Sequence, residues 1–316
     1  MTVLRFLLPA TLGLFLIPAL ATAQTRTFRS EPNAPIVVTG ERVTREQARE
    51  RAVTFVRQVG VARGETPVAR WTDRVCPRVL GIALAYSSIV EARMREIAEA
   101  AGMQIGRDGC QPNIVVSFVG DAAGLVRDIA RRAPRRIQQV SPELRDNLLN
   151  GDAPVRWWYV TEIRGREQMR NAPQSLQPAG AAEDGGAAAN YPNGGRSEGR
   201  IEVEALQQYS SSIISTQGAR SIIDAQVVID LDRAEGQSLQ TVAAYAAFVA
   251  FSEVRPSQPP PTGSILGLFG AEPGARGLTD WDMAFLRSLY NIALDRQARR
   301  HRGMLVRDMV GFQTRE

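Results

Sequence analysis

The sequence predicts a single α+β domain arranged around one buried helix. Runs of β-branched residues occur between segments of helical apolar periodicity, and no internal repeat orders them. Residues 238–252 carry apolar side chains on all sides of a helical wheel, which indicates a helix that is covered on every side. The 316 residues are sufficient for one large domain or two small ones. We expect one domain over residues 41–295, with flanking segments of different character.

The segment 1–23 has the features of a secretory signal peptide. Arg5 precedes an apolar run over residues 6–20, and a small-x-small pattern ends at Ala23. We expect cleavage between Ala23 and Gln24. The alternative is an uncleaved membrane anchor, although the apolar run is short for a bilayer span. No later segment reaches about 18 continuous apolar residues, so we expect a periplasmic or secreted protein without a transmembrane segment in the mature chain.

The basic composition excludes two kinds of chemistry. The chain contains no lysine, so apart from one histidine its basic residues are all arginines. A Walker-type phosphate loop and the Schiff base of pyridoxal phosphate both need a lysine amine, and both are excluded. The net charge is +5, and loss of residues 1–23 would remove Arg5 and no acidic residue, leaving +4 (5 minus 1). This excess is too modest to indicate a nucleic-acid partner.

Two arginine-rich clusters are candidates for contact with anions. They are "RRAPRR" (131–136) and "RQARRHR" (296–302). No aromatic residues lie between the arginines as platforms for base stacking, so we expect no nucleic-acid partner. An anionic envelope surface is one interpretation of the clusters, and a solvated face is the other.

The two cysteines, Cys76 and Cys110, predict a disulfide, because an even cysteine pair in an exported chain is usually oxidised. They are 34 residues apart (110 minus 76), and closing a loop of this length would stabilise the fold by roughly 3–4 kcal/mol in the chain-entropy model. Two unpaired, buried thiols are the alternative. A catalytic cysteine is disfavoured because the only histidine, His301, is distant in sequence and lies within an arginine cluster.

The N-terminal part of the domain begins with a capped helix. Residues 24–40 are polar and predict a loose N-terminus. Thr44 and Gln47 then have capping-box spacing. The apolar residues that follow share one helical face; they are Ala48, Ala52, Phe55 and Val56.

Residues 78–119 predict a strand–helix–strand unit. "RVLGIALAY" (78–86) indicates a buried strand that runs into a turn, and a capping box over 88–91 predicts the start of a helix at Ser88. Gly102 follows that helix as its C′ residue. "NIVVSFVGD" (113–121) is β-branched and predicts the second strand. The helix between the strands is indicated by apolar residues at helical spacing, which are Val90, Met94, Ile97 and Ala101.

The middle of the chain changes character abruptly. Residues 121–150 favour helix, and the aromatic run "VRWWYVTEIRG" (155–165) predicts a strand. Residues 171–200 are rich in Pro, Gly, Ala and polar residues without periodicity, so they predict a flexible insertion on the surface. Two further strands are expected around 208–216 and 225–232.

The C-terminal part contains the central helix and one more. The prolines at 256 and 259–261 end the central helix, and a Pro/Gly-rich crossing extends to residue 277. A last helical region starts at Thr279, which forms a capping box with Asp282. We prefer this capping role for Asp280 and Asp282 over an acid–base pair. Residues 296–316 are expected to form a basic tail.

Two other constellations offer weaker chemistry. Residues 230–236 resemble a calcium loop, but Ala234 and Glu235 stand where a ligand and a glycine are needed, so a polar turn is the preferred interpretation. The serines at 210–212 lack a Gly-x-Ser-x-Gly setting. Their only candidate base, His301, is expected in the exposed tail.

The C-terminal block resembles the core of the zincin metallopeptidases, especially a group of uncharacterised secreted bacterial proteins with a zincin-like fold. The strand "AQVVIDLD" leads into the apolar helix, "SILGLF" (264–269) follows, and "GLTDWDMAFLRSLY" (277–290) closes the core. "QPNIVVSF" (111–118) is similar to the strand that packs beside the active helix in that family. The resemblance covers about residues 78–119 and 208–295. It implies a mixed sheet packed against a central apolar helix.

The chain departs from this family at the HExxH motif. Alignment of "YAAFV" (245–249) with the motif puts Tyr245 and Val249 at the metal-binding histidines and Ala246 at the catalytic glutamate. A zinc site of this type needs two imidazoles one helical turn apart and a glutamate that takes a proton from the bound water. We therefore expect no catalytic, metal-binding or cofactor-binding residue and no cofactor.

The function predicted from the sequence is that of an exported pseudo-peptidase, a non-catalytic binding or structural protein of the cell envelope. Its partner would be an unidentified protein or envelope component. One alternative is a hydrolase with an unrecognised, metal-independent site. The other is an envelope-surface protein that is held by its arginine clusters.

Overall fold

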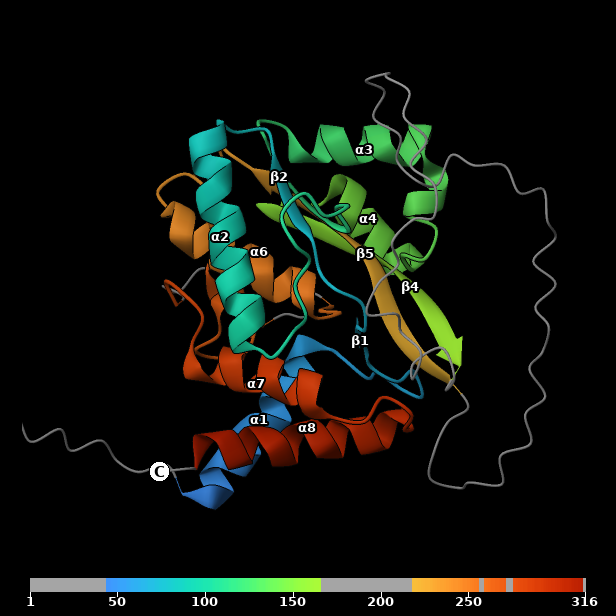
Figure 1. Ribbon diagram of the computed structural model, residues 1–316, viewed down its shortest axis with the longest axis vertical. Helices are drawn as coiled ribbons and strands as arrows, with labels where there is room; N and C mark the ends of the chain where they lie inside the picture. Colours follow the sequence, from blue (N-terminus) through green and yellow to red (C-terminus); the bar gives the residue numbers. More distant parts are fainter. Residues whose placement is uncertain (1–43, 166–217, 256–258, 271–274, 315–316) are drawn as a thin grey trace, which may run out of the picture. The chain divides into compact units, whose positions relative to one another are not determined.

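The computed structural model describes residues 44–165, 218–255, 259–270 and 275–314, which belong to one unit (Figure 1). The predicted signal peptide, the loose N-terminus, the insertion at 171–200 and the strand around 208–216 lie outside the described residues. None of the described helices combines the length and the apolar character that a bilayer crossing requires.

Five strands form one mixed sheet with β5 (Gly218–Asp230) at its centre. Successive parts of β5 pair in parallel with β1 (Ala69–Trp71) and β3 (Ile114–Val119), and β2 (Pro77–Leu80) pairs in parallel with β3. β4 (Val155–Gly165) pairs antiparallel with β5 along nearly its whole length. In the described part of the chain, β4 therefore forms one edge of the sheet, and β2 and the short β1 form the other (Figure 1).

Two apolar cores place the helices on the two faces of the sheet. Five helices build the larger core; they are α1 (Arg45–Val59), α2 (Leu84–Ala100), α6 (Leu239–Phe251), α7 (Asp280–Asn291) and α8 (Ala298–Gln313). The smaller core is built by α3 (Ala122–Arg132), α4 (Pro142–Asn150) and Ile137, which follows the 3-10 helix η1 (Pro134–Arg136). Val227 and Ile229 of β5 enter the larger core and Val228 enters the smaller one, since successive strand residues point to opposite faces. The α+β class predicted from the sequence is confirmed.

Helix α6 is the centre of the larger core, as its apolar composition predicts. Each residue from Thr241 to Phe251 is buried, and α6 contacts both α2 and β5. The unpaired carbonyls at the end of a buried helix need donors. Side chains of three other elements supply them: Trp71 Nε1 donates to the carbonyl of Ala250 at 2.8 Å, and the Tyr290 hydroxyl to that of Phe251 at 2.6 Å. The Tyr159 hydroxyl lies 2.6 Å from the carbonyl of Val249.

The capping predictions at the two ends of the domain are confirmed. Thr44 caps α1 with a complete capping box, and Thr279 does the same for α7 through Asp282. The buried Asp282 carboxylate also accepts hydrogen bonds from Ser264 Oγ at 2.5 Å and from the Ile265 amide at 2.9 Å. It thereby joins the 3-10 helix η2 (Ile265–Gly267) to the start of α7, which is a structural role.

The strand predicted within 78–86 is present as β2 and runs into a turn, but it is shorter than expected, and the predicted capping box at Ser88 is wrong. The strand ends at Leu80 because Gly81 adopts a left-handed conformation with φ +87°, and α2 begins at Leu84. Ser88 is the fifth residue of the helix, and its hydroxyl donates to the carbonyl of Leu84 at 2.8 Å. Glu91 does not complete a capping box either, since it accepts the amide of Val79 in β2 at 2.8 Å.

The expected basic tail is also wrong, because residues 298–313 form α8. Ala298, Leu305 and Met309 lie on one helical face and are fully buried, so the helix packs into the domain against α1 and α7. His301 lies on the same face and is fully buried too. The arginines of the cluster lie between these positions in sequence and point outward or to the rim, which is why the segment looks like a tail by composition.

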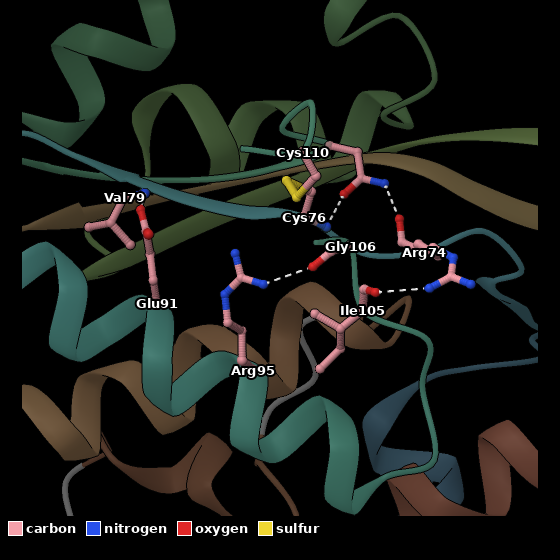
Figure 2. The surroundings of a disulfide bond; sticks show 9 residues. Arg74, Cys76, Val79, Glu91, Arg95, Ile105, Gly106 and Cys110 are labelled. Carbon is pink, nitrogen blue, oxygen red and sulfur yellow. Dashed lines mark hydrogen bonds between the residues drawn. A yellow bond between two sulfur atoms is a disulfide. The ribbon is translucent and has the colours of Figure 1, made fainter. Parts of the chain in front are cut away.

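The predicted disulfide between Cys76 and Cys110 is present, with the two Cα atoms 6.0 Å apart (Figure 2). A Cβ atom at Gly106 would lie 2.7 Å from the Cys110 sulfur, so the neighbouring chain needs a glycine there. The Asn113 side chain accepts the amide of Cys76 at 2.7 Å and donates to the carbonyl of Arg74 at 2.9 Å. The disulfide therefore joins the segment that precedes β2 to the segment that precedes β3.

Candidate functional site: the groove along strand β4

The residues that align with the zincin motif are all buried in the core, and one of them also borders a cavity. Ala246 and Val249 are fully buried. Tyr245 is 6 % exposed, and its ring meets Trp157 and Phe269 edge-on at centroid distances of 6.2 and 5.3 Å. Within the described ranges, no group of three His, Cys, Asp or Glu residues is placed to hold a metal ion. Tyr245 is thus the residue of this motif that reaches a cavity.

That cavity is a groove of about 630 Å³ that follows strand β4. The backbone and side chains of Val155–Tyr159 line its floor. The wall on the α4 side includes Val140, Leu144 and Leu148, and the opposite wall includes Val254, Leu266 and Phe269. Both walls are therefore largely apolar, and the two cores of the domain meet at the groove.

The outer backbone edge of β4 faces this groove. The amide of Asp230 in β5 donates to the carbonyl of Pro154 at 2.9 Å. Hydrogen-bonding direction alternates along an antiparallel strand, so the backbone groups of Val155, Trp157 and Tyr159 point away from β5. Among the described residues, β5 is the only strand that pairs with β4. Within the described ranges, the N–H and C=O groups of Val155, Trp157 and Tyr159 therefore have no strand partner on this side.

The Gln139 side chain shows how a peptide group fits this edge. Its Nε2 donates to the carbonyl of Thr161 at 3.0 Å, and its Oε1 accepts the amide of Thr161 at 2.8 Å. These are the two hydrogen bonds that a residue of an added strand makes with its partner. Thr161 is therefore covered by a side-chain amide, while Trp157 and Tyr159 on the same edge are not.

A charged cluster borders the groove near Thr161. Arg220 donates from Nη1 and Nη2 to the two carboxylate oxygens of Glu253 at 2.6 and 2.7 Å. Arg255 lies 3.6 Å from the same carboxylate. Two arginines thus share one glutamate, which leaves a positive excess at this end of the groove.

Tyr159 anchors the floor of the groove rather than offering a reactive phenol. Its hydroxyl lies 2.8 Å from the carbonyl of Ser252 in addition to its contact with α6, and it accepts the amide of Val254 at 3.2 Å. Burial, together with the negative charge of Glu253, raises the pKa of Tyr159 well above its ordinary value. The phenol therefore stays protonated and holds β4 against the end of α6.

Arg156 fixes the wall on the α4 side. Its buried guanidinium donates to the carbonyls of Leu148 at 3.1 Å and Ala153 at 2.7 Å, and to that of Gly151. These carbonyls lie at and just beyond the C-terminus of α4, where a cation is favourable. Burial lowers the pKa of Arg156 from its ordinary value.

One buried donor at the groove has no acceptor. Trp158 is 2 % exposed and lines the groove, yet its Nε1 hydrogen finds no acceptor among the described residues. An unsatisfied buried donor costs about 1–3 kcal/mol, so an acceptor supplied by a ligand or by water would be favourable here.

The remaining sequence candidates lie elsewhere. The serines at 210–212 and the signal cleavage site at Ala23 and Gln24 are outside the described residues. Asp230 accepts the backbone amides of Ala122 and Arg233, as a turn residue does. The sequence analysis did not predict the groove. The one feature of the sequence that could have indicated it is the aromatic run at 155–165, because a strand edge that binds a peptide needs large apolar side chains beside it.

His301 is placed away from the groove and is not exposed. Its Nδ1 accepts the amide of Val68 at 3.2 Å, and its Nε2 lies 3.0 Å from the carbonyl of Ala293. This geometry requires the neutral ring with its hydrogen on Nε2. Burial lowers the pKa of His301, opposed by the hydrogen bond to Ala293. The ring therefore ties α8 to the segment just before β1 and to the residues that follow α7.

Comparison with protein-family models, curated proteins and solved structures finds no match to this chain.

Proposed function

We propose that the protein is a non-catalytic binding module that takes an extended peptide segment along the edge of β4. The observation that carries this proposal is the open backbone edge of β4 on the floor of the groove. Peptides bind such edges by adding a strand, with affinity from main-chain hydrogen bonds and specificity from alternate side chains. The carboxamide of Gln139 already occupies one position of this edge in the manner of a peptide group.

The composition of the groove indicates the class of peptide. Alternate side chains of an added strand point to opposite sides. On one side they would meet Leu144 and Leu148 of the α4 wall, and on the other side Tyr245, Leu266 and Phe269. We infer a segment with apolar side chains at alternate positions. An acidic residue or a carboxylate would suit the Thr161 end, where two arginines share Glu253.

The pseudo-peptidase interpretation is part of the same proposal. It is supported by the order of elements, in which β5, α6, η2 and α7 follow one another as in the zincin core that the sequence resembles. It is also supported by Tyr245, Ala246 and Val249, whose side chains can neither ligate zinc nor take a proton from water at neutral pH. On this proposal, apolar core residues have replaced the metal-binding residues, and the neighbouring edge strand β4 has remained accessible.

Selection of peptides from a displayed random library, on protein purified with its disulfide intact, tests this function. We expect enrichment of peptides with alternating apolar residues, and fluorescence of Trp157 and Trp158 should change when a selected peptide binds. Leu144→Asp should weaken binding about 10-fold or more, because it puts a charge in the apolar wall. The matched control is Ile163→Asp, at a position of β4 that is 78 % exposed and does not line the groove.

Equal weakening by both variants would contradict a binding site in the groove. So would a library that yields no peptide, or peptides whose affinity neither variant changes. The partner, by the predicted export of the chain, would be a protein of the cell envelope or its surroundings.

A further inference from the structure

A second pocket, of about 360 Å³, lies away from the groove and shares no residue with it. It is formed by three segments: the end of β1 and the loop after it, the turn after α2, and the end of α7 with the residues that follow. Trp71, Met103 and Leu294 give it an apolar lining and are each almost fully buried. Arg70 and Gln104 provide polar groups.

Arg70 is held in this pocket by fixed neighbours. Its Nη1 donates to the carbonyl of Leu289 at 2.8 Å, near the C-terminus of α7. Its guanidinium carbon lies 5.6 Å from the centre of the Tyr290 ring, and that ring is fixed by the hydrogen bond of its hydroxyl to the carbonyl of Phe251. The orientation of the guanidinium is therefore preorganised, and one hydrogen bond leaves most of its N–H groups for other acceptors.

The two carboxylates that line the pocket are each occupied by a different arginine. Asp73 accepts two hydrogen bonds from Arg164, at 2.8 and 2.6 Å. Asp295 pairs with Arg296 at 2.5 Å. Among the ion pairs of the described residues, none includes Arg70. Arg70 is thus the one cation among the described lining residues and has no carboxylate partner there, whereas the arginines that hold the two carboxylates lie outside the lining.

We propose that this pocket binds a monocarboxylate with an apolar body, held by the guanidinium of Arg70. The planar fork of a guanidinium matches the two oxygens of a carboxylate. One cation surrounded by Trp71, Met103 and Leu294 suits a singly charged anion better than a phosphate dianion, whose second charge would be left unpaired in apolar surroundings. The ligand is either a free acid or the C-terminal residue of a peptide. This site is independent of the groove.

Thermal unfolding at constant ionic strength tests the proposal, with three probes. Benzoate represents a free acid, N-acetylphenylalanine represents a C-terminal residue, and N-acetylphenylalaninamide is the uncharged match of the second probe. A ligand of the native state raises the Tm with its concentration. We expect a shift with at least one carboxylate at millimolar concentration and none with the amide. Benzoate alone would indicate a free acid, and N-acetylphenylalanine alone a peptide C-terminus.

Variants of Arg70 assign the effect to the pocket. Arg70→Gln keeps a donor for the carbonyl of Leu289 but has no charge, and its affinity should fall about 10-fold or more. Arg70→Lys keeps the charge without the fork and should lose less. The control is Arg307→Gln, since the side chain of Arg307 is 71 % exposed outside the pocket.

Three results would overturn the proposal: no Tm shift of the native protein with either carboxylate, an equal shift with the amide, or an undiminished shift in Arg70→Gln. If circular dichroism shows that Arg70→Gln does not fold, Arg70→Lys replaces it in the test. The ligand should then raise the Tm of Arg70→Lys less than that of the native protein, and an equal rise would overturn the proposal.

Discussion

Strands β2 and β4, which lie at opposite edges of the sheet, differ in how their outer backbone groups are covered. β2 is four residues long, starts with a proline that has no amide hydrogen, and its outward amide at Val79 is taken by Glu91 of the next helix. β4 is eleven residues long, and in the described part of the chain only Thr161 on its outer edge has a side-chain amide across it. Exposed strand edges invite pairing with other chains, and proteins usually blunt them. The difference between the covered edge of β2 and the groove along β4 supports the proposal that a peptide binds along β4.

The closed edge is built locally, and the open edge is not. Glu91 is twelve residues from Val79, and the disulfide fixes the segment immediately before β2. The walls of the β4 groove come instead from α4 on one side and from residues 253–255 and 260–270 on the other, and these segments are distant from α4 in sequence. The closed edge therefore depends on a few short-range contacts, whereas the groove depends on the whole domain.

The largest effect should follow from removing the brace of the closed edge. The double variant Cys76→Ala, Cys110→Ala should lose roughly 3–4 kcal/mol of unfolding free energy, because the unfolded chain is no longer constrained by a loop of 34 residues. Urea unfolding of variant and native protein measures the loss. Native protein kept in reductant is the control and should behave like the variant. A loss below about 1 kcal/mol would show that the disulfide contributes little to this edge.

The next effect tests the anchor of the open edge. Tyr159→Phe keeps the ring but leaves the carbonyl of Val249, at the buried end of α6, without its donor, and removes the contacts of the hydroxyl with Ser252 and Val254. We expect the unfolding free energy to fall by about 1–3 kcal/mol, and its dependence on urea concentration to stay unchanged. Tyr86→Phe is the control near the closed edge; Tyr86 is 58 % exposed and its change should stay within about 0.5 kcal/mol. If both variants lose the same unfolding free energy, the Tyr159 hydroxyl does not stabilise the fold more than an exposed hydroxyl does.

Opening the closed edge should have a smaller effect. Glu91→Ala leaves the amide of Val79 without its acceptor, at a cost of about 1 kcal/mol. Hydrogen exchange of the Val79 amide should become faster, while Glu96→Ala, on the exposed side of the same helix, should leave it unchanged. An unaltered exchange rate in Glu91→Ala would mean that the edge is protected by something other than this side chain.

Short-range features of this fold were predictable from the sequence, and the contacts between distant segments were not. The strand 155–165 has the predicted bounds, since its β-branched and aromatic residues favour strand locally. The capping box predicted at Ser88 does not form, because the Glu91 carboxylate accepts the amide of Val79 in β2 instead of an amide at the start of its own helix. The stripe of α8, with apolar residues and His301 at helical spacing, was present in the sequence but masked by the arginines between them.

The groove could not be predicted for a related reason. Its floor and walls unite Gln139, Trp157, Tyr245 and Phe269, which lie in four separate segments. Which edge of a sheet stays open depends on the order of the strands, and that order is set by tertiary packing. The sequence resemblance suggested a buried helix with altered chemistry at Tyr245, but it did not indicate that Tyr245 would border an open edge.

The last prediction concerns Gln139, whose replacement should hardly change stability but should change how a peptide binds. Gln139→Ala frees the amide and carbonyl of Thr161, and because Gln139 is exposed, the unfolding free energy should change by no more than about 0.5 kcal/mol.

If a peptide adds as a strand to β4, the carboxamide of Gln139 ends its site at Thr161. Extending a selected peptide past this point should then leave the affinity of the native protein unchanged and raise that of the variant about 5- to 10-fold, for roughly one added hydrogen bond. Gln138→Ala, at the neighbouring exposed position, should behave like the native protein. Fluorescence titration with the short and extended peptides measures all three proteins. If the extension strengthens binding equally in all of them, the peptide does not run along the edge that Gln139 closes, even though it binds the groove.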